Sequence, residues 1–244
     1  MTAGPRCSTQ RVPAIIRSVP TSDSTRWTII RGAAAGNAND RAEFARRYAS
    51  VICSYLGARW RGGPLLAEID DATQEVFLQC FRSGGPLERA EPARSGGFRA
   101  FLYGIVRNVA RGVERERRAR RARQPGSGFD VEAIEARDAP LSQVFDRAWA
   151  GALLRRAAAR QARDIRGDAR AERRVELLRL RFGQDMPIRE IARLWKVDAP
   201  PLHEEYRTAR REFLAALRCV VAEDNPGPPE QIEAECARLL DHLG

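Results

Sequence analysis

Hydrophobic positions recur along this chain at helical rather than strand spacing. In residues 98–123 the apolar side chains fall three or four positions apart, as in an amphipathic helix with one buried stripe. Similar spacing recurs over four further stretches, residues 40–57, 69–81, 171–182 and 202–217. No stretch alternates convincingly between apolar and polar residues at period two, the pattern of a half-buried strand. The sequence therefore predicts an all-α fold.

Changes in composition along the chain predict how these helices are divided into domains. Residues 1–24 contain Pro, Ser and Thr without periodicity and predict a flexible N-terminal tail. Residues 124–140, QPGSGFDVEAIEARDAP, predict an acidic flexible linker. Two helical domains are then expected, over residues 25–123 and 141–222. Residues 223–244 form a C-terminal extension, whose amphipathic helix needs a surface to cover on this protein or on a partner.

Local signals predict the ends of the first two helices. A short helix is expected from Thr25, broken near Gly36. Asn39 or Asp40 is expected to cap the next helix, because short polar side chains accept hydrogen bonds from the first turn. That helix is expected to end near Gly57.

Residues 186–217 have the pattern of two helices joined by a tight connection. Pro187 suits the first turn of a short helix, and Lys196 with Val197 forms the connection. Asp198 is expected to cap the second helix, whose first turn tolerates prolines at 200 and 201. The second helix is long and basic, which is typical of a DNA-binding helix-turn-helix, although a plain helical hairpin has the same pattern.

The charge of the chain favours a polyanionic partner. Its 244 residues contain 42 Lys and Arg against 32 Asp and Glu, a formal net charge of +10. Such an excess indicates nucleic acid before membrane, although Lys196 is the only lysine and arginine usage also follows genome composition. No apolar run approaches the ~20 residues that span a bilayer. The N-terminus lacks the apolar core of a signal peptide. The sequence predicts a cytoplasmic protein without a membrane partner.

Residues for catalysis or metal binding are sparse. The chain has five widely spaced cysteines without a C-x-x-C pair, and two histidines, His203 and His242. Cys53 and Cys80 lie on apolar stripes and are expected to be small buried side chains. No phosphate-binding glycine motif is present. We therefore expect no metal site, no cofactor and no enzymatic activity.

The helix of residues 98–123 is the strongest candidate for a nucleic-acid contact. Guanidinium groups bind phosphates, an aromatic ring stacks on an unpaired base, and an amide hydrogen-bonds a base edge. All three kinds of side chain surround its apolar stripe, Tyr103 and Asn108 among the arginines. A solvated helix that is merely rich in arginine is the alternative.

A second unusual surface is the acidic and amide-rich side of residues 69–81. Val76, Phe77, Cys80 and Phe81 are expected to face inward. The opposite side then carries the polar residues Asp71, Gln74, Glu75 and Gln79. An ordinary solvated face is the alternative interpretation.

These motifs together resemble an extracytoplasmic-function (ECF, group IV) sigma factor of bacterial RNA polymerase, over residues 25–123 and 141–220. The segment DATQEVFL (71–78) looks like the region 2 helix that binds the polymerase clamp helices. The segment FRAFLYGIVRN (98–108) looks like the promoter-melting helix, and residues 187–213 look like the region 4 helix-turn-helix. Arg26-Trp27 and the C-terminal helix resemble a divergent branch with a helical extension.

The resemblance implies three sets of contact residues and an all-α pair of domains, a region 2 bundle and a region 4 helix-turn-helix. Core-polymerase contacts fall on Asp70, Asp71, Gln74, Glu75, Leu78 and Gln79. Contacts to the −10 element fall on Arg99, Phe101, Tyr103, Arg107, Asn108, Arg111 and Arg115. Contacts to the −35 element fall on Arg189, Arg193, Lys196, His203, Arg207, Arg210 and Arg211.

The implied partners are core RNA polymerase and promoter DNA, with an anti-sigma factor left open as a third. The acidic linker would run through the polymerase channel that RNA later uses. One departure from the family is the run His203, Glu204 and Glu205, where recognition helices usually carry basic or small polar residues. The −35 contact is therefore expected to be weak, altered or shifted to neighbouring arginines.

Two other classes of protein remain as alternatives. A stand-alone helix-turn-helix regulator would use residues 25–123 as an effector or dimerisation domain and would bind duplex DNA without polymerase. An enzyme acting on nucleic acid is disfavoured, because the sequence shows neither a clustered carboxylate metal site nor an activated nucleophile.

Overall fold

The computed structural model describes residues 25–91, 97–123, 138–165 and 167–241, and these ranges contain α-helices and no strand. The predicted all-α class is confirmed for this part of the chain. The expected tail, residues 1–24, and residues 124–137 of the expected linker lie outside the described residues.

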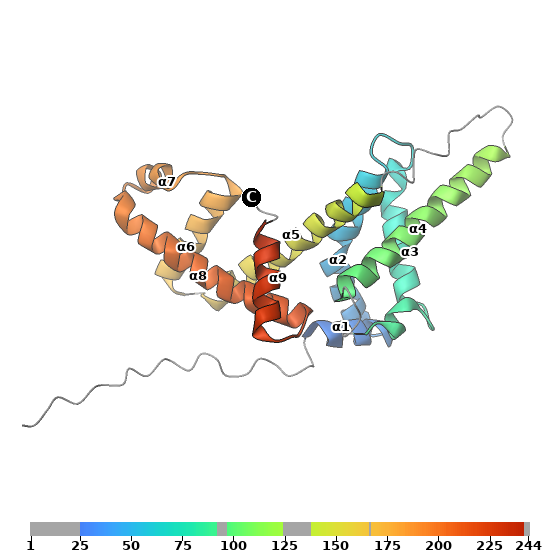
Figure 1. The fold of residues 1–244 in the computed structure, drawn as a ribbon, viewed down its shortest axis with the longest axis horizontal. Helices are drawn as coiled ribbons and strands as arrows, with labels where there is room; N and C mark the ends of the chain where they lie inside the picture. Colours follow the sequence, from blue (N-terminus) through green and yellow to red (C-terminus); the bar gives the residue numbers. More distant parts are fainter. Residues whose placement is uncertain (1–24, 92–96, 124–137, 166, 242–244) are drawn as a thin grey trace, which may run out of the picture.

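Nine α-helices are labelled in Figure 1, and two helical groups lie at opposite ends of the molecule. The N-terminal group contains α1 (Thr25–Ala34), α2 (Ala38–Arg59), α3 (Ile69–Phe81) and α4 (Gly97–Ala122). Helix α5 (Asp138–Asp164) runs from this group toward the other one. The remaining helices are α6 (Ala169–Leu178), α7 (Ile188–Trp195), α8 (Ala199–Asp224) and α9 (Pro229–Asp241). Short 3-10 turns cover Leu66–Glu68 and Pro86–Arg89, and a π-helical turn covers Arg179–Gly183.

The ends of α2 differ from those expected. Its N-cap is Asn37, whose side-chain oxygen accepts a hydrogen bond from the Asp40 N–H at 3.1 Å, so the expectation of Asn39 or Asp40 was wrong. The helix also continues past Gly57 to Arg59, a residue that is buried. Tertiary packing of this last turn outweighs the helix-ending tendency of a single glycine.

The larger core joins both ends of the sequence. It contains apolar residues of α1 to α4, and also residues of α5, the C-terminal half of α8, and α9. On α5, Phe145 and Trp149 are buried. The Trp149 ring stacks on Tyr48 of α2, with ring centroids 5.5 Å apart and planes at 15°. Helix α5 was expected to open a separate second domain, but it packs on α2. The expected division between residues 25–123 and 141–222 is not shown by the packing.

A smaller core lies within the helix-turn-helix. It is formed by residues from the end of α6, the π turn, α7 and the start of α8: Leu177, Leu180, Ile188, Ile191, Ala192 and Leu202. Four of them, Ile188, Ile191, Ala192 and Leu202, belong to the two-helix pattern seen in the sequence, whereas Leu177 and Leu180 come from the preceding segment. The helix-turn-helix thus has a core of its own at the far end of α8 from the larger core.

The C-terminal helix α9 covers a surface of this same protein. Ile232, Cys236 and Leu239 are buried in the larger core. Arg218 of α8 also forms an ion pair with Glu233 of α9. The sequence left open whether this helix covers a surface of this protein or of a partner. These three residues pack internally.

A buried ion pair fixes α4 against the end of α2. The Arg59 and Glu114 side chains are only 3% and 6% exposed. Arg59 donates to Glu114 through Nε at 2.6 Å and through Nη2 at 3.0 Å, and the Trp60 indole N–H donates to the same carboxylate at 2.9 Å. Glu114 is therefore a structural residue that positions α4.

Candidate nucleic-acid interface

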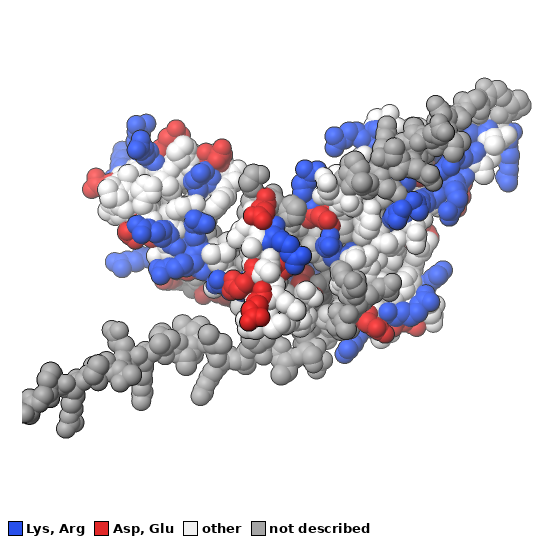
Figure 2. Space-filling model, viewed as in Figure 1, with Lys and Arg blue, Asp and Glu red and all other residues white. Residues whose placement is uncertain are grey.

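The basic side chains of α4 gather over its C-terminal half, which Figure 2 shows as a blue region at one end of the molecule. Arg115, Arg118, Arg120 and Arg123 are exposed there. Carboxylates pair with only part of this charge: Arg120 contacts Glu116 at 3.1 Å, and Arg117 contacts Glu68 at 2.8 Å. The face therefore keeps an excess of positive charge, as a phosphate-binding surface requires.

The N-terminal half of α4 contacts α5. Of the predicted −10 residues, Asn108 is exposed, whereas Phe101, Tyr103 and several arginines are half-buried. The Tyr103 ring lies 5.2 Å from the Phe145 ring and 5.6 Å from the Tyr55 ring, edge to face in both pairs. Tyr103 of α4 thus packs against aromatic rings of both α2 and α5.

The other predicted −10 residues are divided between this contact and the open surface. Phe101 lies 5.8 Å from Phe98, at the edge of the larger core. Arg99 forms an ion pair with Asp146 of α5. Arg107 and Arg111 are half-buried, whereas Arg115 is exposed. The structure therefore places all seven predicted residues on one helix, but α5 contacts two of them, Arg99 and Tyr103.

The face of α3 presents an exposed leucine among acidic and amide groups. Asp70, Asp71 and Gln74 are exposed, and Leu78 is 65% exposed. The half-buried pair Glu75 and Gln79 is joined by a hydrogen bond of 3.0 Å from the amide to the carboxylate. We call the predicted polymerase contacts Asp70, Asp71, Gln74, Glu75, Leu78 and Gln79 the α3 face.

A second exposed leucine precedes α3. Leu66, in the 3-10 turn before it, is 50% exposed. Sequence reasoning missed this residue. The signal was the apolar pair at 65–66 directly before the acidic helix, of which Leu65 is buried and Leu66 is not.

The turn of the helix-turn-helix is closed by backbone bonds. Lys196 has left-handed backbone angles, φ 55° and ψ 47°. Its N–H donates to the Arg193 carbonyl at 3.2 Å, and the Val197 N–H donates to the Ala192 carbonyl at 3.0 Å. This is a left-handed helix C-cap, which orients α7 against α8.

Asp198 occupies the N-cap position of α8, as expected, but its side chain accepts no capping hydrogen bond. The reason is in the sequence. A capping carboxylate accepts from the second or third N–H of the helix. Those positions are Pro200 and Pro201, which have no N–H to donate. The expected side-chain cap is therefore wrong.

The predicted −35 residues share an exposed surface of α7 and α8. Arg189, Arg193 and Lys196 are exposed on α7 and the turn, and His203, Arg207, Arg210 and Arg211 are exposed on α8. The guanidinium of Arg210 lies 5.8 Å from the Tyr206 ring centroid. The described residues therefore bring this whole set together on adjacent helices.

The two glutamates that depart from the family pattern are both engaged by arginines. Glu204 forms an ion pair with Arg207 one helical turn away. Glu205 is half-buried and contacts Arg173 of α6 at 3.3 Å. These pairs neutralise carboxylates that would otherwise repel phosphate, so the surface of α7 and α8 keeps a basic excess.

The described residues supply no metal centre. No group of three or more His, Cys, Asp or Glu in the described ranges is placed to hold a metal ion. Cys80 is buried, and burial raises the pKa of its thiol to about 12. Cys53, by contrast, is half-buried, with its sulfur 3.4 Å from the Thr73 hydroxyl. Across the same ranges, no helix has the length and apolarity needed to cross a bilayer.

Comparison with known proteins adds no relative. No protein-family model, curated protein or solved structure matches the chain.

Proposed function

We propose that this protein is a sigma factor of the extracytoplasmic-function type, which binds core RNA polymerase and directs promoter recognition, −10 melting and initiation. The observation that carries the proposal is the order of three surfaces along one helical chain. The α3 face comes first, the basic helix α4 second, and the basic helix-turn-helix third. The sigma-factor family that the sequence resembles has the same motifs in the same order.

The α3 face has the chemistry of a protein-docking surface. An exposed large apolar side chain such as Leu78 is an anchor for a partner, and surrounding carboxylates and amides orient that partner. The carboxylates of this face would repel the phosphates of DNA. The α3 face therefore suits a basic and apolar surface of the polymerase.

Helix α4 supplies the groups needed to hold melted DNA. Exposed Asn108 offers an amide to a base edge, and the arginines toward Arg123 offer charge to phosphates. Flipping a base costs a few kcal/mol, which stacking and hydrogen bonds can return. The chain requires no catalytic residue for this step, since binding energy alone holds the strand open.

The contact between α4 and α5 adds a conformational step to this mechanism. Tyr103 becomes available for stacking only when its ring leaves both Phe145 and Tyr55, and Arg99 becomes available to phosphate only when it leaves Asp146. A solvent-accessible ion pair of this kind is worth about 0.2–1 kcal/mol, and an aromatic pair about 0.5–1.5 kcal/mol beyond its buried area. Separating the two helices also exposes Phe145, which is fully buried, so polymerase and promoter contacts must supply that cost as well.

The experiment is a binding assay with core RNA polymerase followed by run-off transcription. Glu75→Arg and Leu78→Ser should each weaken polymerase binding about tenfold or more, because they remove charge complementarity and the apolar anchor. Glu230→Arg, a charge reversal of an exposed α9 residue, is the matched control. Urea unfolding checks that each variant is folded. A chain that does not bind core polymerase, or loses equal affinity in all three variants, contradicts the proposal.

A stand-alone helix-turn-helix regulator is the second candidate. It is favoured by one observation, namely that the helix-turn-helix has its own core and an exposed basic surface. This candidate requires tight binding of a duplex operator without polymerase and no effect of Glu75→Arg. Gel-shift titration with and without core polymerase separates the two functions.

A further inference from the structure

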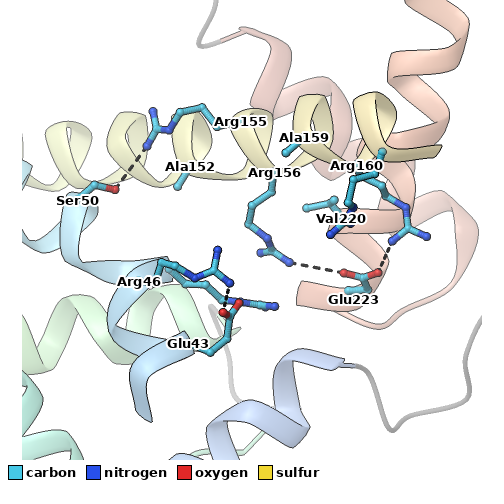
Figure 3. A pocket seen from close by; sticks show the side chains of 12 residues that line it. Glu43, Arg46, Ser50, Ala152, Arg155, Arg156, Ala159, Arg160, Val220 and Glu223 are labelled. Carbon is cyan, nitrogen blue, oxygen red and sulfur yellow. Dashed lines mark hydrogen bonds and ion pairs between the residues drawn. The ribbon is translucent and has the colours of Figure 1, made fainter. Parts of the chain in front are cut away.

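A pocket lined by arginines lies between α2, α5 and α8, away from the three surfaces described above. Its volume is about 300 Å³. Figure 3 shows Arg156 and Arg160 pointing toward Glu223, and Arg155 pointing toward Ser50. Its guanidinium groups belong to Arg46, Arg47, Arg155, Arg156, Arg160 and Arg163. We call this set the arginine pocket.

The carboxylates of the arginine pocket do not balance its positive charge. The two that line it are Glu43 and Glu223. Glu43 accepts from Arg47 at 2.6 Å and also pairs with Arg46, and Glu223 accepts from Arg160 at 2.6 Å. Six guanidinium groups thus face two carboxylates. Asp224 takes a further bond from Arg156 at 2.7 Å, and Asp164 lies 3.7 Å from Arg160, which still leaves an excess of two positive charges.

Several N–H groups of the pocket have no protein acceptor. Within the described part of the chain, Arg155 makes one long contact of 3.5 Å with the Ser50 hydroxyl, and Arg163 has no carboxylate partner. The buried Nη1 of Arg47 has no hydrogen-bond partner there either. Arg155 and Arg163 are exposed and can be hydrated, whereas the buried donor of Arg47 is costly to leave unsatisfied. An anion would satisfy this donor and reduce the repulsion among the guanidinium groups.

We infer that the arginine pocket binds a small polyphosphate anion, such as pyrophosphate or the polyphosphate group of a nucleotide. Guanidinium forks match phosphate oxygens in a bidentate manner, and the excess of two charges matches two linked phosphates better than one carboxylate. A volume of about 300 Å³ is that of a small-ligand site. A continuous nucleic-acid backbone carries further phosphates beyond those that fit the pocket. Glu43 and Glu223 on the walls would repel these phosphates.

Binding at this place has a structural consequence. The pocket takes Arg46 and Arg47 from α2 in the N-terminal helical group, and the other four arginines from α5. A polyphosphate in it bridges α2 to α5 and stabilises the packing that holds Phe145 against Tyr103. The binding step itself does not depend on the proposed function in transcription.

The test is calorimetric titration of the full chain with pyrophosphate, together with thermal unfolding. We expect saturable binding, and a rise in Tm of about 5–10 °C at a pyrophosphate concentration near 100 Kd. Arg155→Gln and Arg163→Gln should each raise Kd about tenfold, and neither removes a buried group. The matched control is Arg147→Gln, an exposed arginine of α5 outside the pocket, for which Kd stays within about twofold.

Three results would overturn the inference. The first is the absence of saturable pyrophosphate binding to the folded wild-type chain. The second is an equal rise in Kd for Arg147→Gln, which would show attraction by net charge rather than a site. Preferential binding of a single-stranded oligonucleotide that is lost in the pocket variants, with no response to pyrophosphate, also contradicts it. None of these readouts involves polymerase, so failure here leaves the proposed sigma function standing.

Discussion

Replacing Glu114 with alanine tests how α4 is held in place. The carboxylate receives three hydrogen bonds of 2.6, 3.0 and 2.9 Å, two from the Arg59 guanidinium and one from the Trp60 indole. Both charged side chains are almost fully buried, at 3% and 6% exposure. Glu114→Ala therefore leaves a buried guanidinium without its counter-charge and an indole N–H without its acceptor.

The expected loss is large for a single substitution. Removing one partner of a buried ion pair costs about 3–5 kcal/mol. For a chain of this length, that corresponds to a fall in Tm of about 6–20 °C. The assay is urea unfolding followed by circular dichroism, with the free energy of unfolding compared at a constant m-value.

A control variant and a compensating double variant test whether the buried ion pair is the cause of the loss. Glu116→Ala lies on the same helix, but Glu116 is 72% exposed and, among the described residues, pairs with exposed Arg120, so its loss should stay below about 0.5 kcal/mol. Arg59→Met combined with Glu114→Leu removes both charges and should recover most of the stability. The reasoning fails if Glu114→Ala costs less than about 1 kcal/mol, or no more than Glu116→Ala.

Three further predictions follow from individual residues. Asn108→Ala should depress open-complex formation more than initial promoter binding, because exposed Asn108 is assigned to the melted strand; equal permanganate reactivity in variant and wild type would contradict that role. Lys196→Gly should stabilise the protein by about 1 kcal/mol in urea unfolding, because φ is 55° at this position; no gain would show that the lysine is unstrained. Burial alone raises the pKa of Glu43, but the hydrogen bonds and charges of Arg47 and Arg46 outweigh it and lower that pKa below 4.5. Glu43 therefore stabilises the fold above pH 4.5 and loses this contribution as the pH falls further, so the stability difference from Glu43→Gln should shrink between about pH 6 and pH 3; a constant difference would contradict the assigned pairing.

Local sequence predicted most helices and much of the candidate surfaces. Apolar spacing of three and four residues is sufficient to place α3, α4, α7 and α8, because each has a stripe that only a helix brings onto one face. Residues on the outside of such a helix share a surface as a matter of geometry. The residues of the α3 face and of the basic set on α7 and α8 are therefore exposed or half-buried on their helices.

Tertiary packing decided what local sequence could not. Arg99 and Tyr103 look like free surface residues by spacing, but Asp146 and Phe145 of α5 contact them across 47 and 42 positions of sequence. Glu114 looks like a surface charge until Arg59, 55 positions earlier, pairs with it.

What the sequence by itself determined is the all-α class, the approximate helices and which side chains share each helix face, since these follow from periodicity within one element. What only the tertiary structure decided is which faces meet: α5 on α2, α9 on α8, and arginines of α2 and α5 around one pocket. The physical reason is that contacts between helices depend on the directions in which loops return the chain, and periodicity within a helix carries no information about those directions.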